Sequence, residues 1–234
     1  MPTTKQLDGH APFPAQQARA IAAAFAPRQP WGNWWDYWYT RIKLGSDPLY
    51  PGVITALRDS AAPVLDLGCG LGLFAHALRT AGLTQPYRGL DIDAAKIGRG
   101  RQIAARSGLH QVQLDVHDLA QGWPDHRGSV TILDVLQYLD APTQQALLED
   151  AAAMLGDDGV LVIRSTLAED SGRGRTSLRA DAWAHRIGWM QERPVHYPSA
   201  DGLRQTLQAA GLRVQLQPLY GNTPFNNWLL VARR

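Results

Sequence analysis

The stretch from Val64 to Asp91, VLDLGCGLGLFAHALRTAGLTQPYRGLD, decides the fold. The short apolar run Val64–Leu67 predicts a buried parallel strand. The glycines after it predict a loop, and the apolar side chains from Leu73 to Leu78 recur at helical spacing. A second strand then ends at Asp91. The order of strand, glycine loop, helix and strand predicts a βαβ unit with an acid at the tip of its second strand.

The spacing of the glycines indicates which ligand this unit suits. A dinucleotide-binding loop has the pattern G-x-G-x-x-G, whose third glycine lets the helix lie close to the strand beneath a pyrophosphate. Here Gly68, Gly70 and Gly72 form G-x-G-x-G, and Leu73 occupies the dinucleotide position. Asp91 is placed to accept hydrogen bonds from two ribose hydroxyls. These residues favour an adenosine without a diphosphate, and they disfavour the rival enzyme class, a nucleotide-dependent oxidoreductase.

Five segments of the chain resemble, in the correct order, the motifs of class I S-adenosylmethionine-dependent methyltransferases. They are Asp66–Gly72, Gly89–Asp93, Leu114–Leu119, Val130–Leu136 and Leu155–Leu161. The resemblance implies a Rossmann-like α/β fold, with a seven-stranded, mostly parallel sheet of strand order 3-2-1-4-5-7-6. It also implies S-adenosyl-L-methionine as cofactor and no metal.

The remaining elements follow from alternating strand and helix patterns. A turn is expected at residues 47–51. Helices are expected at residues 14–26, 53–58, 94–105, 143–155 and 199–210, and strands at 112–115, 130–134, 160–165, 212–217 and 227–232. Two parts are expected, an N-terminal helical cap or lid at residues 1–58 and a methyltransferase domain at 59–234. Residues 166–198 are too long for an ordinary connection and are expected to be a substrate insertion.

The resemblance also implies roles for individual cofactor-site residues. Asp115 would accept from the adenine amino group, with the backbone N–H of Val116 donating to the ring; the alternative is a solvated loop acid. Asp66 would orient the methionine portion, or else only hydrogen bond within the loop. Lys43 or Arg41 would meet the methionine carboxylate if the preceding segment folds over the cofactor. The full expected set is Lys43, Asp66, Gly68, Cys69, Gly70, Gly72, Asp91, Ile92, Asp115, Val116, Asp134 and Gln137.

Candidate catalytic residues lie where the acceptor would approach. Methyl transfer from a sulfonium is an in-line displacement, so catalysis consists mainly of alignment, desolvation and help with a proton. Tyr138 follows the fourth strand, Arg164 ends the fifth strand, and His185 lies in the insertion. Many relatives have a histidine where Gln137 stands, and glutamine cannot act as a base. The stretch also lacks the Asn/Asp-Pro-Pro-Tyr pattern of nucleic-acid and protein amine methyltransferases, which favours O- or C-methylation of a small molecule.

The segment from Trp31 to Leu44 is the compositional outlier, because it holds four of the eight tryptophans of the chain. One interpretation is a helix that packs onto the main domain through its aromatic area. A second is a lid that covers the cofactor and supplies one wall for an aromatic or apolar substrate. The third is a membrane-interface anchor.

Composition excludes several function classes. The net charge of +2 comes from scattered arginines, so nothing resembles a nucleic-acid-binding face. Cys69 is the only cysteine, which rules out a disulfide within the chain. Neither a secretion signal nor an apolar window of about 18 residues is present, which predicts a cytoplasmic protein with no membrane span. His76, His110 and His126 are expected to face solvent or a helix surface.

A narrower resemblance concerns the acceptor. Residues 41–50, 134–139 and 221–230 look like methyltransferases encoded with bacterial aryl-polyene, xanthomonadin-like pigment biosynthesis. This resemblance implies a phenolic or aryl acceptor, free or bound to a carrier protein. The five arginines of the insertion (Arg173, Arg175, Arg179, Arg186 and Arg193) form either a solvated surface or a site for a carboxylate or an acidic carrier. A non-enzymatic alternative is a cofactor-binding accessory protein.

Overall fold

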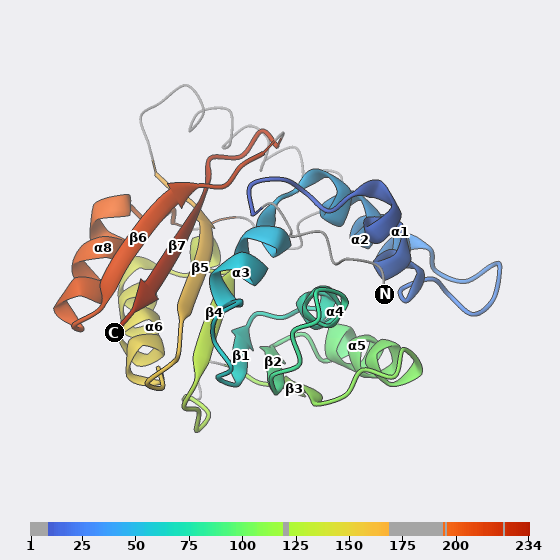
Figure 1. Ribbon diagram of the computed structural model, residues 1–234, viewed down its shortest axis with the longest axis horizontal. Coiled ribbons are helices and arrows are strands. Elements are labelled where there is room, and N and C mark those ends of the chain that lie inside the picture. Colours follow the sequence, from blue (N-terminus) through green and yellow to red (C-terminus); the bar gives the residue numbers. More distant parts are fainter. Residues whose placement is uncertain (1–8, 119–121, 169–193, 195, 222) are drawn as a thin grey trace.

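The computed structural model describes residues 9–118, 122–168, 194, 196–221 and 223–234 (Figure 1). Its helices are α1 (Ala15–Ala23), α2 (Trp35–Ser46), α3 (Leu49–Leu57), α4 (Leu73–Thr80), α5 (Ala94–Arg106), the 3-10 helix η2 (Leu136–Tyr138), α6 (Ala141–Ala153) and α8 (Ala200–Ala209). Its strands are β1 (Val64–Leu67), β2 (Tyr87–Asp91), β3 (Val112–Val116), β4 (Ser129–Leu133), β5 (Leu161–Thr166), β6 (Arg213–Pro218) and β7 (Asn227–Arg233).

The seven strands form one sheet of order β3-β2-β1-β4-β5-β7-β6, which confirms the expected topology. Strands β1 to β5 are parallel, and β7 runs antiparallel between β5 and β6. The register places Leu67 opposite both Leu90 and Ile132. The carboxyl ends of β1, β2 and β4 therefore meet at one edge of the sheet, where ligands of such folds bind.

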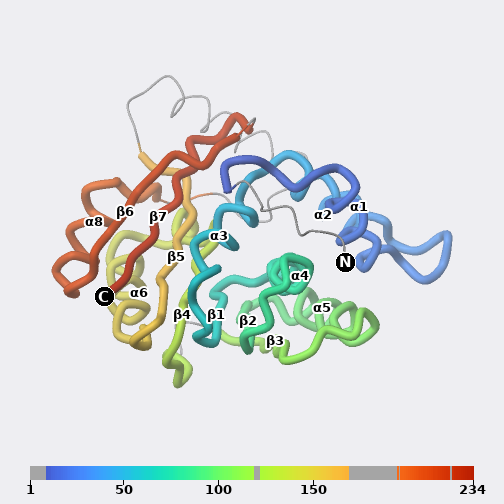
Figure 2. Tube along the Cα trace, viewed as in Figure 1, coloured from blue at the N-terminus to red at the C-terminus, as the bar shows by residue number. Residues whose placement is uncertain are grey.

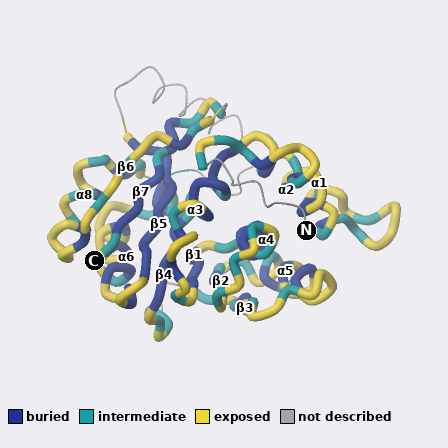
Figure 3. The backbone as a smooth tube through the Cα atoms, in the orientation of Figure 1, coloured by how far each residue is buried: buried dark blue, intermediate teal, exposed yellow. Residues whose placement is uncertain are grey.

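Helices cover both faces of the sheet (Figure 1). On one face, α1, α3, α4 and α5 bury their apolar side chains in a single cluster with side chains of β1, β2, β3, β5 and β7. On the other face, α6 and α8 pack against β1, β4, β5 and β7. Figure 3 shows the central strands as buried along most of their length, and β5 is buried at every position. Strands buried on both faces explain the continuous apolar runs in the sequence.

The N-terminal helices share the core of the sheet domain. Phe13, Ile21 and Phe25 lie in the same buried cluster as Leu78 of α4. The guanidinium of Arg106 in α5 also donates to the carbonyl oxygens of residues 24 and 26. Residues 9–57 are therefore packed onto the face of the sheet rather than held by a single connection.

Two helices begin earlier than expected. The predicted turn at residues 47–51 is wrong in its second half, because α3 starts at Leu49 and includes Pro51. Proline fits there because amides of a first turn have no partner within the helix, and the carboxylate of Asp47 accepts from the Leu49 amide. Helix α6 starts at Ala141 because Asp140 caps it by accepting from the amide of Thr143.

The expectation that His76 faces solvent is wrong. Its side chain is buried between α4 and α1, with its ring 4.8 Å from that of Phe25. Burial, assisted by the charge of Arg106, lowers the pKa of His76 from 6.5 to about 4. The amphipathic pattern could not reveal this, because residues 9–25 cover a face of α4 that a lone βαβ unit would leave in water.

This buried histidine makes the protein acid-sensitive. Between pH 6.5 and about 4 the unfolded chain binds a proton at His76 that the folded protein does not. The free energy of unfolding should therefore fall by up to about 3 kcal/mol as the pH drops through this window. Replacing His76→Leu should remove that part of the slope in denaturant unfolding curves. An unchanged slope would contradict the assignment, and the exposed His110 provides the matched control, His110→Leu.

Candidate active site

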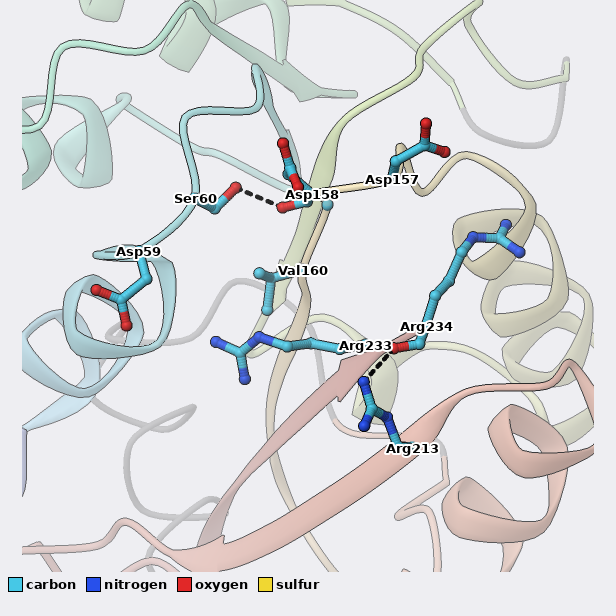
Figure 4. Close-up of a pocket in the computed structure, with 9 residues that line it drawn as sticks. Asp59, Ser60, Asp157, Asp158, Val160, Arg213, Arg233 and Arg234 are labelled. Atoms are coloured by element: carbon cyan, nitrogen blue, oxygen red, sulfur yellow. Dashed lines mark hydrogen bonds between the residues drawn. The ribbon is translucent and has the colours of Figure 1, made fainter.

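The predicted site residues gather at the carboxyl edge of the parallel strands. Asp66 lies in β1, Asp91 and Val116 end β2 and β3, and Asp134 follows β4. At the other end of the parallel strands, where their amino ends lie, a polar hollow is found beside the segments that lead into β1 and β5 (Figure 4). It is lined by Asp59, Ser60, Asp157, Asp158, Gly159, Val160, Arg213, Arg233 and Arg234, none of which is a predicted site residue.

The loop after β1 needs its three glycines for backbone geometry. Gly68, Gly70 and Gly72 all have positive φ angles, of 77°, 56° and 73°. A Cβ atom at Gly68 would lie 2.4 Å from Val135, and one at Gly72 would lie 2.9 Å from Leu114. A Cβ at Gly70 would meet nothing within 4 Å, so this glycine faces open space. The loop thus presents bare backbone to whatever occupies that space.

Cys69 lies in the same loop but points into the protein. A Cβ at Gly89 of β2 would lie 2.7 Å from its sulfur, so loop and strand approach closely there. Burial, followed by the charges of Asp66 and Asp91, raises the pKa of the Cys69 thiol far above its usual range. Its side chain therefore fills space behind the loop as a neutral thiol.

Asp91 is held rigidly at the tip of β2. One carboxylate oxygen accepts from the amide of Gly70 at 2.8 Å, and the other accepts from the amide of Asp93 at 2.9 Å. Asp93 in turn caps α5, because its carboxylate accepts from the amides of Ala95 and Lys96. Each oxygen of Asp91 has further lone pairs, so the carboxylate can still accept from a pair of adjacent hydroxyls.

Two apolar side chains project from the neighbouring strand ends. Ile92, directly after β2, is 68% exposed, and Val116, at the end of β3, is 48% exposed. Such exposure of large aliphatic side chains beside a glycine loop marks an apolar contact surface rather than part of the core. Both residues belong to the predicted cofactor site, and the structure places them next to Asp91.

The carboxylate of Asp115 already has protein partners. One oxygen accepts from Arg101 at 3.1 Å, and the other accepts from Arg88 at 3.0 Å and Gln113 at 2.7 Å. In the sheet register Asp115 pairs with Leu90, whereas Val116 pairs with Asp91 at the end of β2. Asp115 therefore lies one position before the end of its strand. This arrangement ties β2, β3 and α5 together.

Asp66 is fully enclosed behind the glycine loop. Its two oxygens accept 2.6 Å hydrogen bonds, one from the Tyr87 hydroxyl and one from the Thr131 hydroxyl. Burial raises the pKa of Asp66 to about 6, even though both hydrogen bonds favour the ionised form. These bonds link β1 to β2 and β4, the two neighbours that carry the rest of the site.

The raised pKa of Asp66 predicts how the free energy of unfolding depends on pH. Between pH 3.8 and about 6 the folded protein retains a proton that the unfolded chain has released, so stability falls as the pH rises. Asp66→Asn should abolish this dependence and, above about pH 6, stabilise the protein by up to about 3 kcal/mol. Thermal melting of both proteins across this window provides the measurement. If the melting temperatures of the wild type and Asp66→Asn depend on pH equally, the raised pKa of Asp66 is refuted. If Asp66→Asn also loses cofactor affinity, Asp66 has a role in binding beyond packing.

An ion cluster joins the N-terminal segment to the fourth and fifth strands. Arg164 of β5 is only 2% exposed, and its guanidinium binds Asp47 through two hydrogen bonds of 3.0 and 3.1 Å. It also contacts Asp134 directly. Lys43 of α2 completes the cluster, with its ammonium 2.7 Å from Asp47 and 3.1 Å from Asp134.

The cluster keeps both acids ionised. Burial alone would raise the pKa of Asp47, but Arg164 and Lys43 outweigh it and lower the value to about 2. For the same reasons the pKa of Asp134 is held below its usual range. Asp134 also has a φ of 60°, an uncommon value for a residue other than glycine. Two cations and a special backbone angle thus fix this carboxylate at the end of β4.

Of the predicted acceptor-side residues, Gln137 is buried and has structural partners. Its side-chain amide donates to the carbonyl oxygen of Asp134 at 3.0 Å, and its amide oxygen accepts from Ser165 at 3.3 Å. Tyr138 is half-buried in η2, within four residues of Asp134. His185, the five arginines from Arg173 to Arg193 and most of the predicted insertion lie outside the described residues.

Three residues of the site were not predicted from the sequence. Asp47 was expected only as part of a turn and Thr131 only as a strand residue, and Tyr87 lies one residue before the expected start of the second strand at Arg88. A signal for Asp47 existed in its position before Pro48, where an acid often caps a helix. The polar side chain of Thr131, between the apolar residues Val130 and Ile132, could have indicated a buried partner.

Comparisons with known proteins agree with this geometry. A family profile described as a methyltransferase domain matches residues 47–217, which is more than half of the chain. The chain is also similar to a ubiquinone biosynthesis O-methyltransferase from Xanthomonas euvesicatoria pv. vesicatoria (strain 85-10), with 30% identity over 115 residues. That alignment covers 49% of this chain and 47% of the relative, so the match spans about half the length of the curated protein.

Solved structures share the fold at low sequence identity. Magnesium protoporphyrin IX methyltransferase from Synechocystis PCC 6803, solved with bound SAH, has a TM-score of 0.63 and 18% identity, covering 94% of each chain. The N-methyltransferase NodS from Bradyrhizobium japonicum WM9, also with S-adenosyl-L-homocysteine, has a TM-score of 0.58 and 20% identity, covering 93% of this chain and 98% of its own. At this level of identity the likeness concerns the fold alone.

Proposed function

Because this chain belongs to the class I S-adenosylmethionine-dependent methyltransferases, we propose that it transfers a methyl group from S-adenosyl-L-methionine to a small aromatic or phenolic acceptor. The observation that carries the donor site is the open space above Gly70, bordered by the fixed carboxylate of Asp91. The named relatives include an O-methyltransferase and an N-methyltransferase, so the fold does not determine the acceptor atom. The acceptor therefore has to be proposed from the acceptor-side residues of this chain.

The residues at the carboxyl edge fit the cofactor. Asp91 would bind the two ribose hydroxyls, and the exposed side chains of Ile92 and Val116 would contact the flat faces of the adenine. The positive-φ backbone at Gly70 would face the ribose and the sulfonium portion. When bound, the cofactor supplies an activated methyl group and needs no metal for its transfer.

We assign Asp115 and Asp66 mainly to support of this site. The carboxylate of Asp115 already binds Arg88 and Arg101. It could accept from an adenine amino group only in addition to those two contacts. Asp66 fixes β1 against both neighbouring strands. Gly68, Cys69 and Gly72 shape the loop from behind. These residues would set affinity through loop geometry rather than through direct contact.

The ion cluster would position the methionine end of the cofactor. Asp134 points from the end of β4 and can accept from the α-amino group, while Lys43 can donate to the α-carboxylate. Arg164 is buried beneath them, so we assign it as a positioning residue that orients Asp134 and Asp47 rather than as a contact of the acceptor. Gln137 holds the same turn through the carbonyl oxygen of Asp134.

On the acceptor side, the proposed reaction forms an oxygen–methyl bond or a carbon–methyl bond as the bond between that methyl carbon and the sulfonium sulfur breaks. S-Adenosyl-L-homocysteine leaves, and the acceptor releases one proton. Gln137 cannot take that proton, so an acceptor that ionises readily, such as a phenol, suits this site. Tyr138 is the described side chain that we assign to orient the acceptor. His185, if it reaches the site from the insertion, would be a candidate base. The resemblance to enzymes of aryl-polyene pigment formation supports an aryl head group, free or carrier-bound.

A labelled-methyl screen tests this function. The purified protein, incubated with methyl-labelled S-adenosyl-L-methionine and a panel of phenols, hydroxybenzoic acids and aliphatic amines, should yield a phenolic product heavier by one methyl group. Transfer to the amines alone would overturn the acceptor class. Tight cofactor binding without transfer to any acceptor would instead support an accessory role. Consumption of a nicotinamide cofactor with the same substrates would support the oxidoreductase.

A further inference from the structure

Helix α2 carries its largest apolar side chains on its solvent side. Trp34, Trp35, Trp38, Tyr39 and Ile42 are between 39% and 48% exposed, and the charged residue among them is Arg41, which lies over the ring of Trp38. We call this set, together with Trp31, the tryptophan face. A surface helix normally exposes its charged residues and buries its apolar ones. Helix α2 departs from this rule, because it exposes several large aromatic side chains and buries Asp36 and Thr40, although Leu44 is also buried.

The inner side of α2 holds the helix in place through both polar and apolar side chains. Asp36, Thr40 and Leu44 are buried, and Asp36 accepts from Arg99 of α5 at 3.0 Å. Lys43 contributes to the ion cluster described above. Trp34, Trp35 and Trp38 bury only part of their surface, so the interpretation that the aromatic area packs this helix onto the domain stays a prediction. The described residues leave the exposed part of these rings open to a partner.

The segment before α2 extends this face. Figures 1 and 2 show residues 24–34 projecting from the body of the protein beyond α5. Trp31 on this segment is 81% exposed. Internal hydrogen bonds fix the loop. The carbonyl oxygen of Gln29 accepts from the amide of Gly32 at 2.9 Å, and the carbonyl oxygen of Pro30 accepts from the Trp34 indole at 2.9 Å. The tryptophan is thus presented on an ordered projection.

The charges around the tryptophan face are positive. Apart from Lys43, which is paired within the ion cluster, residues 9–46 contain the bases Arg19, Arg28 and Arg41 and a single acid, Asp36, which is buried against Arg99. Arg41 lies over the ring of Trp38, 5.1 Å from its centroid. Helix α5 adds Arg106, whose guanidinium donates to the carbonyl oxygens of residues 24 and 26; its other three bases pair with acids, Lys96 with Asp93, Arg99 with Asp36 and Arg101 with Asp115. The surroundings are therefore complementary to an anionic partner.

We propose that the tryptophan face is a docking surface for the headgroup region of a bilayer containing anionic phospholipid. Tryptophan and tyrosine rings prefer the boundary between headgroups and acyl chains, and nearby arginines gain from anionic lipid. Uncharged aromatic side chains on a projecting, ordered loop and one helix face suit a shallow insertion. No helix among the described residues has the length and apolarity of a membrane span. This proposal does not rest on the methyltransferase activity.

Vesicle co-sedimentation tests the proposal. The full chain should sediment with vesicles of equimolar phosphatidylcholine and phosphatidylglycerol, and brominated acyl chains should quench part of its tryptophan fluorescence. The triple variant Trp31→Gln, Trp35→Gln, Trp38→Gln should bind at least about tenfold more weakly. Trp34 stays in place because its indole supports the loop. Circular dichroism checks that the variant remains folded, and the single variant Trp31→Gln serves if it does not.

A charge pair completes the test. Arg28→Gln should weaken vesicle binding about fivefold, as expected for one arginine near an anionic surface, whereas Arg204→Gln on α8 should leave it unchanged. Absence of sedimentation, or equal binding to phosphatidylcholine alone, would overturn the proposal. A concentration-dependent dimer that the triple variant abolishes would also overturn it, because a second copy of the chain would then cover the face.

Discussion

Replacing Asp91→Ala is expected to weaken the binding of S-adenosyl-L-methionine at least about 100-fold. The substitution removes the carboxylate proposed to accept from both ribose hydroxyls, and hydrogen bonds to a charged group contribute about 1.5–3 kcal/mol each. It also removes the acceptor for the amide of Gly70, which lies 2.8 Å away, so the glycine loop loses its anchor. Isothermal titration calorimetry with S-adenosyl-L-homocysteine measures the effect directly.

Two controls separate the loss of a ligand contact from a loss of fold. Asp91→Asn keeps an oxygen for the Gly70 amide but not the charge, and it should bind the ligand with intermediate affinity. Glu149→Ala removes an exposed acid from α6, on the other face of the sheet, and should bind as the wild type does. Wild-type affinity in Asp91→Ala would remove the basis for placing the ribose at this strand tip.

Replacing Arg164→Met is expected to cost about 3–5 kcal/mol of stability, which is the usual effect of leaving a buried charge without its partner. Asp47 and Asp134 would then share only Lys43. For a domain of this size, such a loss lowers the melting temperature by roughly 6–20 °C. Differential scanning calorimetry at neutral pH provides the measurement.

Matched variants show whether charge or packing causes this loss. Arg164→Lys keeps the charge but cannot form the two-pronged contact with Asp47, so its melting temperature should lie between those of the wild type and Arg164→Met. Adding Asp47→Asn to Arg164→Met should recover stability, because one uncompensated carboxylate disappears. If Arg164→Met melts within about 2 °C of the wild type, the cluster is not what holds α2 to the sheet.

The local sequence was sufficient to predict the βαβ unit and most strands. A buried strand of a parallel sheet is a mostly apolar run, and Val64–Leu67, with Asp66 as its one polar residue, and the first half of the fifth strand, Leu161–Ile163, both show this pattern. The position of β7 between β5 and β6 came from family resemblance, because periodicity says nothing about which strands pair. The glycine loop was predictable because three positive-φ positions in five residues require glycine.

The ion cluster was not predictable because its members are distant in sequence. Arg164 and Asp47 are 117 positions apart, and Lys43 and Asp134 are 91 apart. The same limitation applies to Asp66, whose buried partners come from two other strands. For α2, composition singled out the tryptophans but did not reveal that they are partly exposed to solvent. The buried side mixes the polar residues Asp36 and Thr40 with the apolar Leu44, which a simple amphipathic pattern does not predict.

The central claim is that the glycine loop and Asp91 form a seat for the adenosine of S-adenosyl-L-methionine. Calorimetric titration of the wild-type protein with S-adenosyl-L-homocysteine tests it most directly. The geometry predicts binding of one molecule per chain, with that binding lost in Asp91→Ala. No heat of binding for the wild type, or identical binding by both proteins, would contradict the claim.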